Sequence, residues 1–293
     1  MNLSIGIDLG GTRIKGVVID ERGIVLHQLY TNTNDGDGAV WKTAVAETVS
    51  QLRKKTISGN CSVGISAPGL PDETNTSIAY MPGRMKGLEG FDWSTALKQK
   101  TCVLNDGVAA LIAEARFGAA RNAKHVVMLT LGTGVGGAVL IDGKPYQGAF
   151  NKAGHIGHMV IDYEGDCDVT GMPGSLEDCI GNCTIEKRSK GKFSTTYALL
   201  AAYRSGNTFA KQVWLKSVKQ LAIGLASITN ILSPQVIVLG GGITEAGNDL
   251  FEPLGTFMEL YEWRAGGNKV KIVKAEHGDL AGAIGAASFA MDK

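Results

Sequence analysis

Two short turns rich in glycine and threonine carry the clearest chemical potential in this sequence. Each follows an apolar run of strand type, and they read Asp8-Leu9-Gly10-Gly11-Thr12 and Leu131-Gly132-Thr133-Gly134-Val135-Gly136. Glycine has no Cβ, so its backbone can adopt a positive φ and approach a ligand closely. A tight turn then directs several N–H groups into one concave nest that favours an anion. Thr12 and Thr133 each add a hydroxyl donor. The pair predicts a duplicated unit that holds a chain of phosphates.

Neither turn matches the two best-known phosphate-binding motifs. The sequence contains no G-x-x-x-x-G-K-[ST] loop. The dinucleotide fingerprint requires a turn that enters a helix, whereas both turns here lead back into a strand. The alternative interpretation is a pair of tight hairpins in which glycine serves only the turn geometry. The acidic Asp8 just before the first turn favours phosphate binding.

The elements that must position these turns alternate between strands and helices. In the first half we expect three strands within 3–30, a helix over 37–55, a strand over 61–66, a short helix over 93–98, a strand over 101–104 and a helix over 107–117. In the second half we expect strands within 125–141, an irregular glycine-rich section over 148–184, helices over 194–204, 207–214 and 213–232, a strand over 236–239, a helix over 244–254, a strand over 271–274 and a final helix over 280–291. This alternation predicts a mixed α/β architecture with a boundary near 118–124.

Composition excludes several classes of protein. The chain has 293 residues, of which 44% are hydrophobic and 19% charged, as expected for a globular protein of two domains. A net charge of +1 provides no electrostatic basis for binding nucleic acid or a membrane surface. No apolar run approaches the length of a membrane span, and the first residues lack the pattern of a signal peptide. The five cysteines are odd in number and irregularly spaced, which favours reduced thiols in the cytoplasm.

Taken in order, the motifs D-L-G-G-T, A-P-G, N-D, L-G-T-G-x-G-G, G-H, G-x-x-G-x-L-E and L-G-G-G resemble the ROK family of bacterial sugar kinases, within the actin-like ATPase superfamily. The resemblance runs from Gly6 to the terminal helix. It implies a two-lobed α/β fold of the actin-like ATPase (ribonuclease H-like) type with a central cleft. The expected lobes are 1–118 plus 280–293, and 119–279. ROK repressors carry an additional N-terminal helix-turn-helix, for which a first strand at residue 3 leaves no room, so we expect an enzyme.

The resemblance also implies roles in holding ATP and Mg²⁺. Asp8 would hold Mg²⁺, directly or through water. The first phosphate loop would comprise Gly10, Gly11, Thr12 and Lys15, and the second Gly132, Thr133, Gly134 and Gly136. The turn Gly240, Gly241 and Gly242 would pack against the adenosine. Nothing in these residues identifies the nucleotide base.

Asp106 is the expected catalytic base, because phosphoryl transfer requires a carboxylate that accepts the proton of the sugar hydroxyl. The sugar would contact the backbone of Gly69 and the side chains of Asn105, Asp106, His155, His158 and Glu177. Considered without the family, Asn105-Asp106 has another interpretation, since such a pair is commonly the N-cap of a helix.

One departure from the family concerns the sugar. Many members read G-E-x-G-H, whereas this chain has His155 in place of the glutamate. A carboxylate accepts two hydroxyl donors, but a neutral imidazole offers one donor and one acceptor. We therefore expect a substrate other than plain glucose, or one held differently at that hydroxyl. Val108 also stands where the family often has a second asparagine.

A second departure concerns a structural zinc ion. Thr170 and Ser175 stand where the family has two cysteines, and neutral hydroxyls are poor zinc ligands. We predict no zinc, so packing must hold the glycine-rich section. The alternative is a rearranged site of His158, Cys167, Cys179 and Cys183, the last two being an i, i+4 pair if they are helical.

The sequence thus predicts an ATP-dependent, Mg²⁺-requiring hexose kinase of the glucokinase type. We expect a cytoplasmic homodimer that binds a small sugar and neither nucleic acid nor a membrane. The alternatives are a kinase of N-acetylhexosamines, such as N-acetylmannosamine or N-acetylglucosamine, and a catalytically weak sugar-sensing regulator of the same fold. The sequence does not identify the sugar.

Overall fold

The computed structural model describes residues 2–34, 40–56, 61–81, 83 and 85–293. The chain divides into two compact units. The first comprises 1–123, 139–153 and 275–293, and the second comprises 124–138 and 154–274. Relative to the boundaries expected from the sequence, the segment 139–153 belongs with the first unit. The boundary between residues 138 and 139 lies within one continuous strand. The sequence has no loop there that could have marked the boundary.

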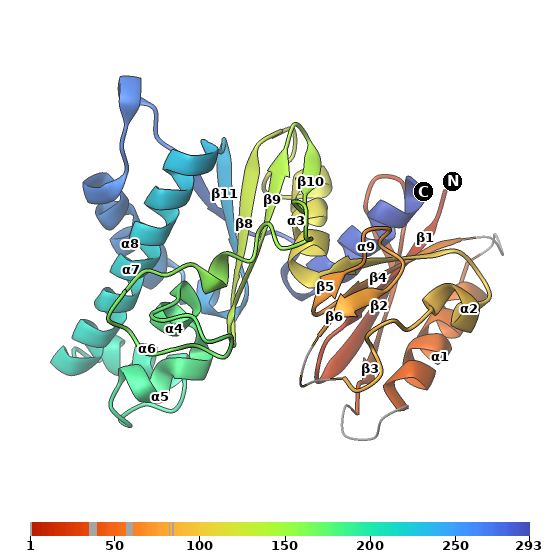
Figure 1. Cartoon of the computed structure of the whole chain (residues 1–293), viewed down its shortest axis with the longest axis horizontal. Coiled ribbons are helices and arrows are strands. Elements are labelled where there is room, and N and C mark those ends of the chain that lie inside the picture. The colour runs from red at the N-terminus through yellow and green to blue at the C-terminus, as the bar shows by residue number, and fades with distance from the viewer. Residues whose placement is uncertain (1, 35–39, 57–60, 82, 84) are drawn as a thin grey trace. The chain divides into compact units, whose positions relative to one another are not determined.

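Two five-stranded sheets share one strand order (Figure 1). The first sheet has the order β3-β2-β1-β4-β7 and the second β10-β9-β8-β11-β12. The bounds are β1 Ser4–Leu9, β2 Arg13–Ile19, β3 Val25–Asn32, β4 Ser62–Ala67, β7 Thr101–Asn105, β8 Val126–Leu131, β9 Val135–Ile141, β10 Lys144–Tyr146, β11 Val236–Gly240 and β12 Lys271–Lys274. In each sheet the first strand of the chain is followed by its neighbour through a glycine turn. The two sheets and their helices confirm the mixed α/β class, and the shared order is the one expected of the predicted duplicated unit.

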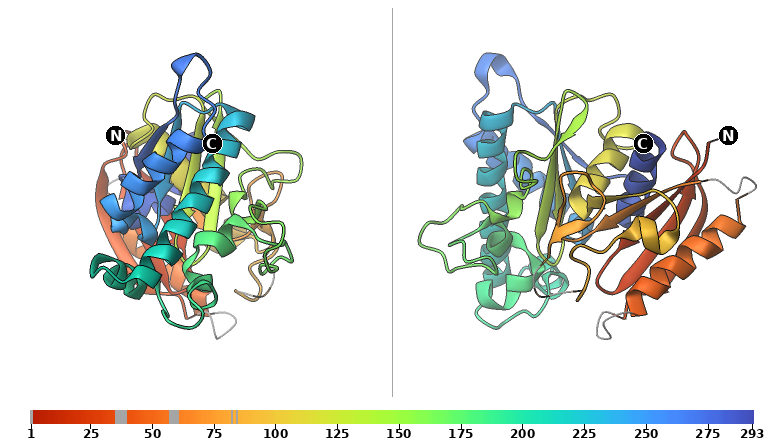
Figure 2. Two further views of the ribbon diagram at one scale, coloured as in Figure 1. Left: turned by 90° about the vertical axis from the view of Figure 1, so that its left-hand side faces the viewer. Right: turned by 45° about the vertical axis from the view of Figure 1, so that its right-hand side comes forward.

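The first sheet is covered on both faces (Figure 2). Its helices are α1 Val40–Lys54, α2 Trp93–Leu97, α3 Asp106–Phe117 and α9 Ala281–Met291. Successive strand residues point to opposite faces. On β1, Ile5 and Ile7 join a fully buried core with Trp41 and Leu52 of α1. The intervening Gly6 faces α9 instead. A small two-stranded sheet of β5 Leu70–Pro71 and β6 Ile78–Tyr80, which the sequence pattern did not predict, accompanies it.

Helix α9 lies unusually close to its neighbours because it is built from small residues. A Cβ placed on Gly6 would lie 1.9 Å from the Ala283 carbonyl oxygen, and one on Gly64 would lie 2.0 Å from that of Ala286. On the other side of α9, a Cβ on Gly285 would lie 1.7 Å from the Ala109 carbonyl oxygen of α3. Glycine is therefore required on both sides of α9.

The second unit adds five α-helices to its sheet within the described residues. They are α4 Leu176–Ile180, α5 Ile185–Arg188, α6 Thr196–Arg204, α7 Thr208–Leu232 and α8 Asn248–Tyr261. The expectation of separate helices over 207–214 and 213–232 is wrong, because α7 is continuous. The buried Val213 and Trp214 continue its apolar face, and no glycine or proline interrupts the helix there. The Trp214 indole donates to the Asp249 carbonyl oxygen of α8 at 2.8 Å.

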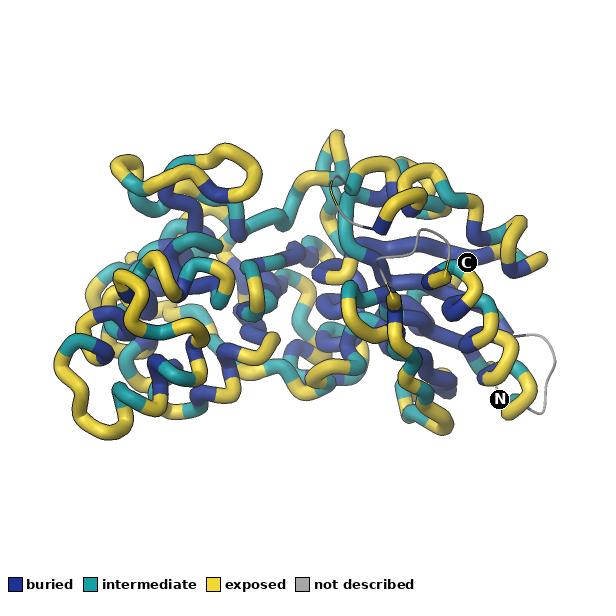
Figure 3. Tube along the Cα trace, turned by 90° about the horizontal axis from the view of Figure 1, so that it is seen from below, coloured by how far each residue is buried: buried dark blue, intermediate teal, exposed yellow. Residues whose placement is uncertain are grey.

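Buried residues are concentrated along the strands and the inner faces of the helices (Figure 3). Within the described part of the chain, no helix has both the length and the apolar character needed to span a membrane.

Candidate active site

In the first unit, the predicted polar residues lie at the carboxyl ends of three adjacent parallel strands. Asp8 of β1 is in register with Ser66 of β4, and Ala67 of β4 with Asn105 of β7. Ligands of open α/β sheets bind at this edge, outside the carboxyl ends of the strands. The topology therefore brings together Asp8, the Gly69 turn and Asn105-Asp106.

The Asp8 carboxylate is fixed by two side chains. Lys15 Nζ lies 3.2 Å from Oδ2, and Ser66 Oγ donates to Oδ1 at 2.9 Å. Lys15 also donates to the Asp279 carbonyl oxygen at 2.8 Å, just before α9. A Cβ on Gly282 would lie 2.7 Å from Asp8 Oδ1, so the first turn of α9 closes over the carboxylate. Sequence reasoning missed Ser66, whose one signal was its position at a strand end.

The first glycine turn is held by backbone bonds and by one threonine. The Gly10 N–H donates to the Arg13 carbonyl oxygen at 3.2 Å. The Thr33 hydroxyl donates to the Gly10 carbonyl oxygen at 2.6 Å, and the Thr33 N–H donates to that of Thr12 at 3.0 Å. The Thr12 side chain is exposed. A braced turn thus presents an exposed hydroxyl, as a phosphate loop would require.

Asn105 is the N-cap of α3, as the alternative interpretation proposed. Its Oδ1 accepts from the N–H groups of Gly107 at 2.9 Å and Val108 at 3.4 Å. Its Nδ2 donates to the Gly69 carbonyl oxygen at 3.0 Å, and Gly69 has a φ of +98°. Asn105 therefore joins the Gly69 turn to the start of α3. The same amide also stabilises the Asp106 carboxylate through a side-chain hydrogen bond.

Asp106 is the first residue of α3, and the residue as a whole remains accessible to solvent although neighbouring protein atoms crowd its carboxylate. Its Oδ1 accepts from the Gly107 N–H at 2.8 Å, which fixes the carboxylate orientation. The surrounding protein desolvates the charged form, and the neighbouring Asp8 carboxylate repels it, so the pKa of Asp106 is raised to about 6. A carboxylate that titrates near neutral pH, in a residue accessible to solvent, suits proton transfer.

In the second unit, the other glycine turn is braced in a similar way. The Gly132 N–H donates to the Gly134 carbonyl oxygen at 2.9 Å. The N–H groups of Asn182 and Cys183 donate to the carbonyl oxygens of Gly132 and Thr133, at 2.9 and 2.8 Å. The Thr133 side chain is exposed, like that of Thr12.

Glu177 is tied to this second turn. Its Oε2 accepts from the Val135 N–H at 2.9 Å, and a Cβ on Gly134 would lie 2.1 Å from that oxygen. Gly136 similarly leaves room for the Thr130 hydroxyl, which would lie 2.5 Å from a Cβ. The absence of a Cβ on Gly134 and Gly136 thus leaves room for the Glu177 carboxylate and the Thr130 hydroxyl to pack against the turn.

The glycine triplet begins at the last residue of β11, beside the same turn. Gly240 is in register with Thr130 of β8. Gly241 has a φ of +86°, and a Cβ there would lie 2.4 Å from the Leu131 carbonyl oxygen. Gly242 begins a 3₁₀ turn, Gly242–Ala246, and a Cβ added to it would have no neighbour within 4 Å. The triplet thus combines one glycine required by packing with one in open space.

His155 precedes the 3₁₀ turn Ile156–His158 and His158 ends it; their rings are parallel, with centroids 6.4 Å apart. His158 Nδ1 lies 3.1 Å from Asp168 Oδ2. Burial alone would raise the pKa of Asp168, but hydrogen bonds from Thr170 and His158 outweigh it and hold the pKa well below its usual range. His158 is therefore oriented by a buried carboxylate.

Hydrogen bonds hold the segment in which the family has its cysteines. The Thr170 hydroxyl donates to Asp168 at 2.7 Å, and Ser175 is the N-cap of α4. The rearranged cysteine site does not have its expected geometry: α4 ends at Ile180, so Cys179 and Cys183 are not an i, i+4 pair of one helix. Burial raises the pKa of Cys179 to about 11. Among the described residues, no three His, Cys, Asp or Glu side chains are grouped to hold a metal. The prediction of no zinc stays a prediction.

Comparison with known proteins places this geometry in a family. The ROK family profile matches residues 4–293. The chain is 29% identical to a glucokinase of Halalkalibacterium halodurans, over 96% of this chain and 92% of the relative. It is 30% identical to an N-acetylmannosamine kinase of Vibrio cholerae, over 82% and 84%. It superposes on a ROK hexokinase from Thermus thermophilus with a TM-score of 0.88 and 27% identity, over 98% and 97%. The chain belongs to the ROK family.

Proposed function

We propose that this protein transfers the γ-phosphoryl group of ATP to a hydroxyl of a hexose, with Asp106 as the base. The similarity to a glucokinase and a hexokinase over nearly the whole chain confirms the sugar kinase predicted from the sequence. The observation that supports the mechanism is the Asp106 carboxylate, which lies at the same sheet edge as Asp8, belongs to a residue accessible to solvent and has a pKa near 6.

Asp106 accepts the proton of the attacking hydroxyl on a carboxylate oxygen as the oxygen–phosphorus bond forms. Above pH 6 its carboxylate is mostly ionised and ready to accept. The Gly107 N–H holds Oδ1, which leaves Oδ2 as the acceptor for the hydroxyl proton. The γ-phosphoryl group moves to the sugar oxygen and ADP leaves. General base assistance of this kind contributes about 10²–10⁴-fold to the rate.

The two braced turns are proposed to bind the phosphates. The exposed Thr12 and Thr133 hydroxyls and the adjacent N–H groups are donors for phosphate oxygens. Asp8 fits Mg²⁺, because this hard cation is commonly held by one or two carboxylates together with substrate phosphates. When bound there, Mg²⁺ would neutralise the charge that develops on the phosphates. Lys15 and Ser66 keep the Asp8 carboxylate in place.

An ADP-release assay across hexoses and N-acetylhexosamines, with Asp106→Asn as the control, tests the proposal. Turnover of one sugar that the variant abolishes supports it. If every sugar fails while one still raises the melting temperature, the protein is a sugar-binding regulator and the proposed activity is wrong.

A second candidate substrate class is the N-acetylhexosamines. His155 in place of the family glutamate and the similarity to an N-acetylmannosamine kinase favour it. The two classes separate in the same assay by kcat/KM for glucose against N-acetylmannosamine. Replacing His155 by glutamate should shift the preference toward glucose. An unchanged preference and KM would remove His155 from the specificity determinants.

We also propose a cytoplasmic homodimer. The resemblance to the family supports the dimer, and the odd, irregular cysteines support a reducing compartment. Light scattering of the purified protein tests the dimer, and a mass of one chain, 30.8 kDa, would contradict it.

A further inference from the structure

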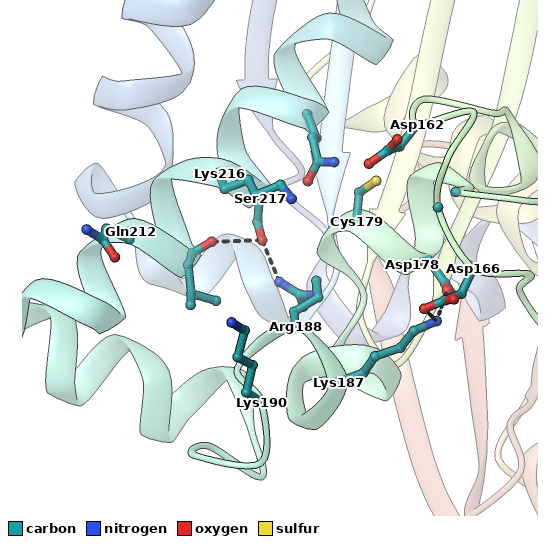
Figure 4. A pocket seen from close by; sticks show the side chains of 14 residues that line it. Asp162, Asp166, Asp178, Cys179, Lys187, Arg188, Lys190, Gln212, Lys216 and Ser217 are labelled. Atoms are coloured by element: carbon teal, nitrogen blue, oxygen red, sulfur yellow. Dashed lines mark hydrogen bonds and ion pairs between the residues drawn. The ribbon is translucent and has the colours of Figure 1, made fainter.

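A pocket lies within the second unit, between the glycine-rich segment and α7 (Figure 4). Its volume is about 390 Å³. The lining side chains come from the segment that contains Asp162 and Asp166, from α4, from the region of α5 and from α7. None of them is assigned to ATP or to the sugar. A pocket of this size accommodates a small metabolite.

The acidic side of the pocket is already neutralised in large part. Lys187 Nζ lies 3.0 Å from an Asp166 carboxylate oxygen and 3.2 Å from one of Asp178. Figure 4 shows this ion-paired group on one side of the pocket and Arg188 between Lys190 and Lys216 on the other. The remaining carboxylate of the lining is that of Asp162.

Arg188 is a half-buried cation whose hydrogen bonds all go to neutral oxygens. Its guanidinium donates to the hydroxyls of Thr184 and Ser217 and to the carbonyl oxygens of Ile180 and Gly181. These bonds use four of its five N–H groups, and one on Nη1 remains. Desolvation lowers the pKa of Arg188 to about 10, so it stays charged at neutral pH.

Three cations of the pocket therefore lack a partner of opposite charge. Within the described part of the chain, Arg188, Lys190 and Lys216 form no ion pair. Arg188 is half-buried, and such a charge is costly unless it is paired, whereas Lys190 and Lys216 are exposed lysines of the lining. Lysine and arginine are the usual binding groups for phosphate. Gln212, Gln220 and Asp162 add hydrogen-bonding groups suited to hydroxyls.

We propose that this pocket binds a small phosphate monoester, such as a hexose phosphate. The phosphate group binds Arg188, Lys190 and Lys216, and the hydroxyls of its carrier bind the glutamines of α7. This binding does not depend on the kinase activity proposed above.

The pocket is connected to the second phosphate loop through short contacts. Arg188 holds the Gly181 carbonyl oxygen at 2.7 Å. The next two residues, Asn182 and Cys183, donate to the backbone of that loop. A ligand that draws Arg188 toward the pocket therefore acts on the loop. On the proposed kinase function, the bound ester changes the KM for ATP.

Calorimetric titration of the full chain with glucose 6-phosphate tests the site. The variant combines Lys190→Asn with Lys216→Gln, because Lys190 has a φ of +52° and asparagine tolerates that conformation. We expect binding at least about tenfold weaker than in the unchanged protein, from the loss of two phosphate contacts. Lys211→Gln is the matched control: Lys211 is an exposed lysine on α7 outside the pocket, and its replacement should leave the affinity unchanged.

The affinities of the variants and of inorganic phosphate show where the ester binds and whether its hydroxyls contribute. Equal weakening by Lys211→Gln would mean a diffuse charge effect, and unchanged affinity in the double variant would place the ester elsewhere, for example at the phosphate loops. Inorganic phosphate that binds as tightly as glucose 6-phosphate would overturn the hydroxyl contacts. Localised binding without sugar turnover would preserve the pocket and contradict the kinase proposal. Kinase activity without binding of glucose 6-phosphate at this pocket would support the kinase proposal and contradict the pocket proposal.

Discussion

Among single residues, Asp106 carries the most specific expectation. Asparagine cannot accept a proton, so Asp106→Asn should lower kcat by about 10²–10⁴-fold while KM for the sugar changes little. The pKa of Asp106 is raised in the folded protein, so its charge is unfavourable for folding at neutral pH. The variant should therefore melt at the same or a higher temperature. A lower melting temperature would mean that the lost activity reflects damaged structure.

The same pKa predicts the pH dependence of the reaction. The base must be ionised, so kcat/KM should rise as the pH increases through about 6 and level off above it. The corresponding contribution to stability runs in the opposite direction, since a raised pKa favours the folded state at low pH and that contribution is lost as the pH passes 6. Rates measured across the range from about pH 5 to about pH 8 test this. A profile flat across pH 6 would contradict a base whose pKa is raised to about 6.

Lys15 should influence the pKa of Asp106, because it partly neutralises the Asp8 charge that raises this pKa. Lys15→Met should leave the Asp8 charge uncompensated, strengthen its repulsion of Asp106 and move the acidic limb of the pH profile to higher pH. Arg13→Met is the control, since Arg13 lies over the Tyr30 ring and does not contact Asp8. A raised KM for ATP with an unmoved pH limb would mean that Lys15 serves the phosphates alone.

Among the helices, α9 shows how sequence composition sets a packing distance. Gly285→Ala would place a Cβ 1.7 Å from the Ala109 carbonyl oxygen, so α9 or α3 must shift. Overpacking of this kind costs about 1–3 kcal/mol, and more where backbone must move. We expect a cost of about 3 kcal/mol in the free energy of unfolding, measured by urea denaturation.

Gly255 provides the matched control for this prediction. It is exposed within α8, and a Cβ added there would meet open space. Gly255→Ala should therefore stabilise the protein by about 0.5–1 kcal/mol through helix propensity. If both substitutions stabilise the protein, the close approach of α9 is not rigid.

The sequence predicted most long elements because their apolar periodicity is local. The strand 271–274 and the glycine hairpins were confirmed at nearly the predicted residues. Short elements such as β5, β6 and α4 were missed because they lie in polar or glycine-rich stretches without a continuous apolar run. The network of Lys15, Ser66 and Asp8 was also missed, because residue 66 meets residue 8 only through strand pairing. Asn105 shows the converse: the structure contains the common local role of a helix N-cap, while its contact with the sugar stays a prediction.

For the molecule as a whole, one buried carboxylate anchors two chain segments that border the second unit. Glu114 of α3 is fully buried and accepts from the Ala119 N–H at 2.9 Å. It also accepts from the N–H groups of Glu276 and His277, at 3.0 and 2.9 Å. The chain first leaves the first unit after Ala123, re-enters it over 139–153, and returns for the last time at Ala275. Both segments are therefore fastened to the same helix.

Glu114→Gln should destabilise the protein by about 2–4 kcal/mol, because an amide presents an NH₂ group to backbone donors and loses charge-assisted bonds. Glu47→Gln, at an exposed position of α1, is the control and should change stability by less than about 0.5 kcal/mol. Urea denaturation of both variants measures the difference. Equal, small effects would show that the two segments hold their positions without this carboxylate.

The shared strand order of the two sheets allows the residues around their glycine turns to be compared position by position. Two residues before Gly10 the first copy has Asp8, and two residues before Gly132 the second copy has Thr130. Under the predicted duplication, the two copies therefore differ at equivalent positions of the same strand order, one bearing an acid and the other a neutral hydroxyl. The chemical difference between the two turns can therefore be traced to one side chain, an aspartate at position 8 and a threonine at position 130.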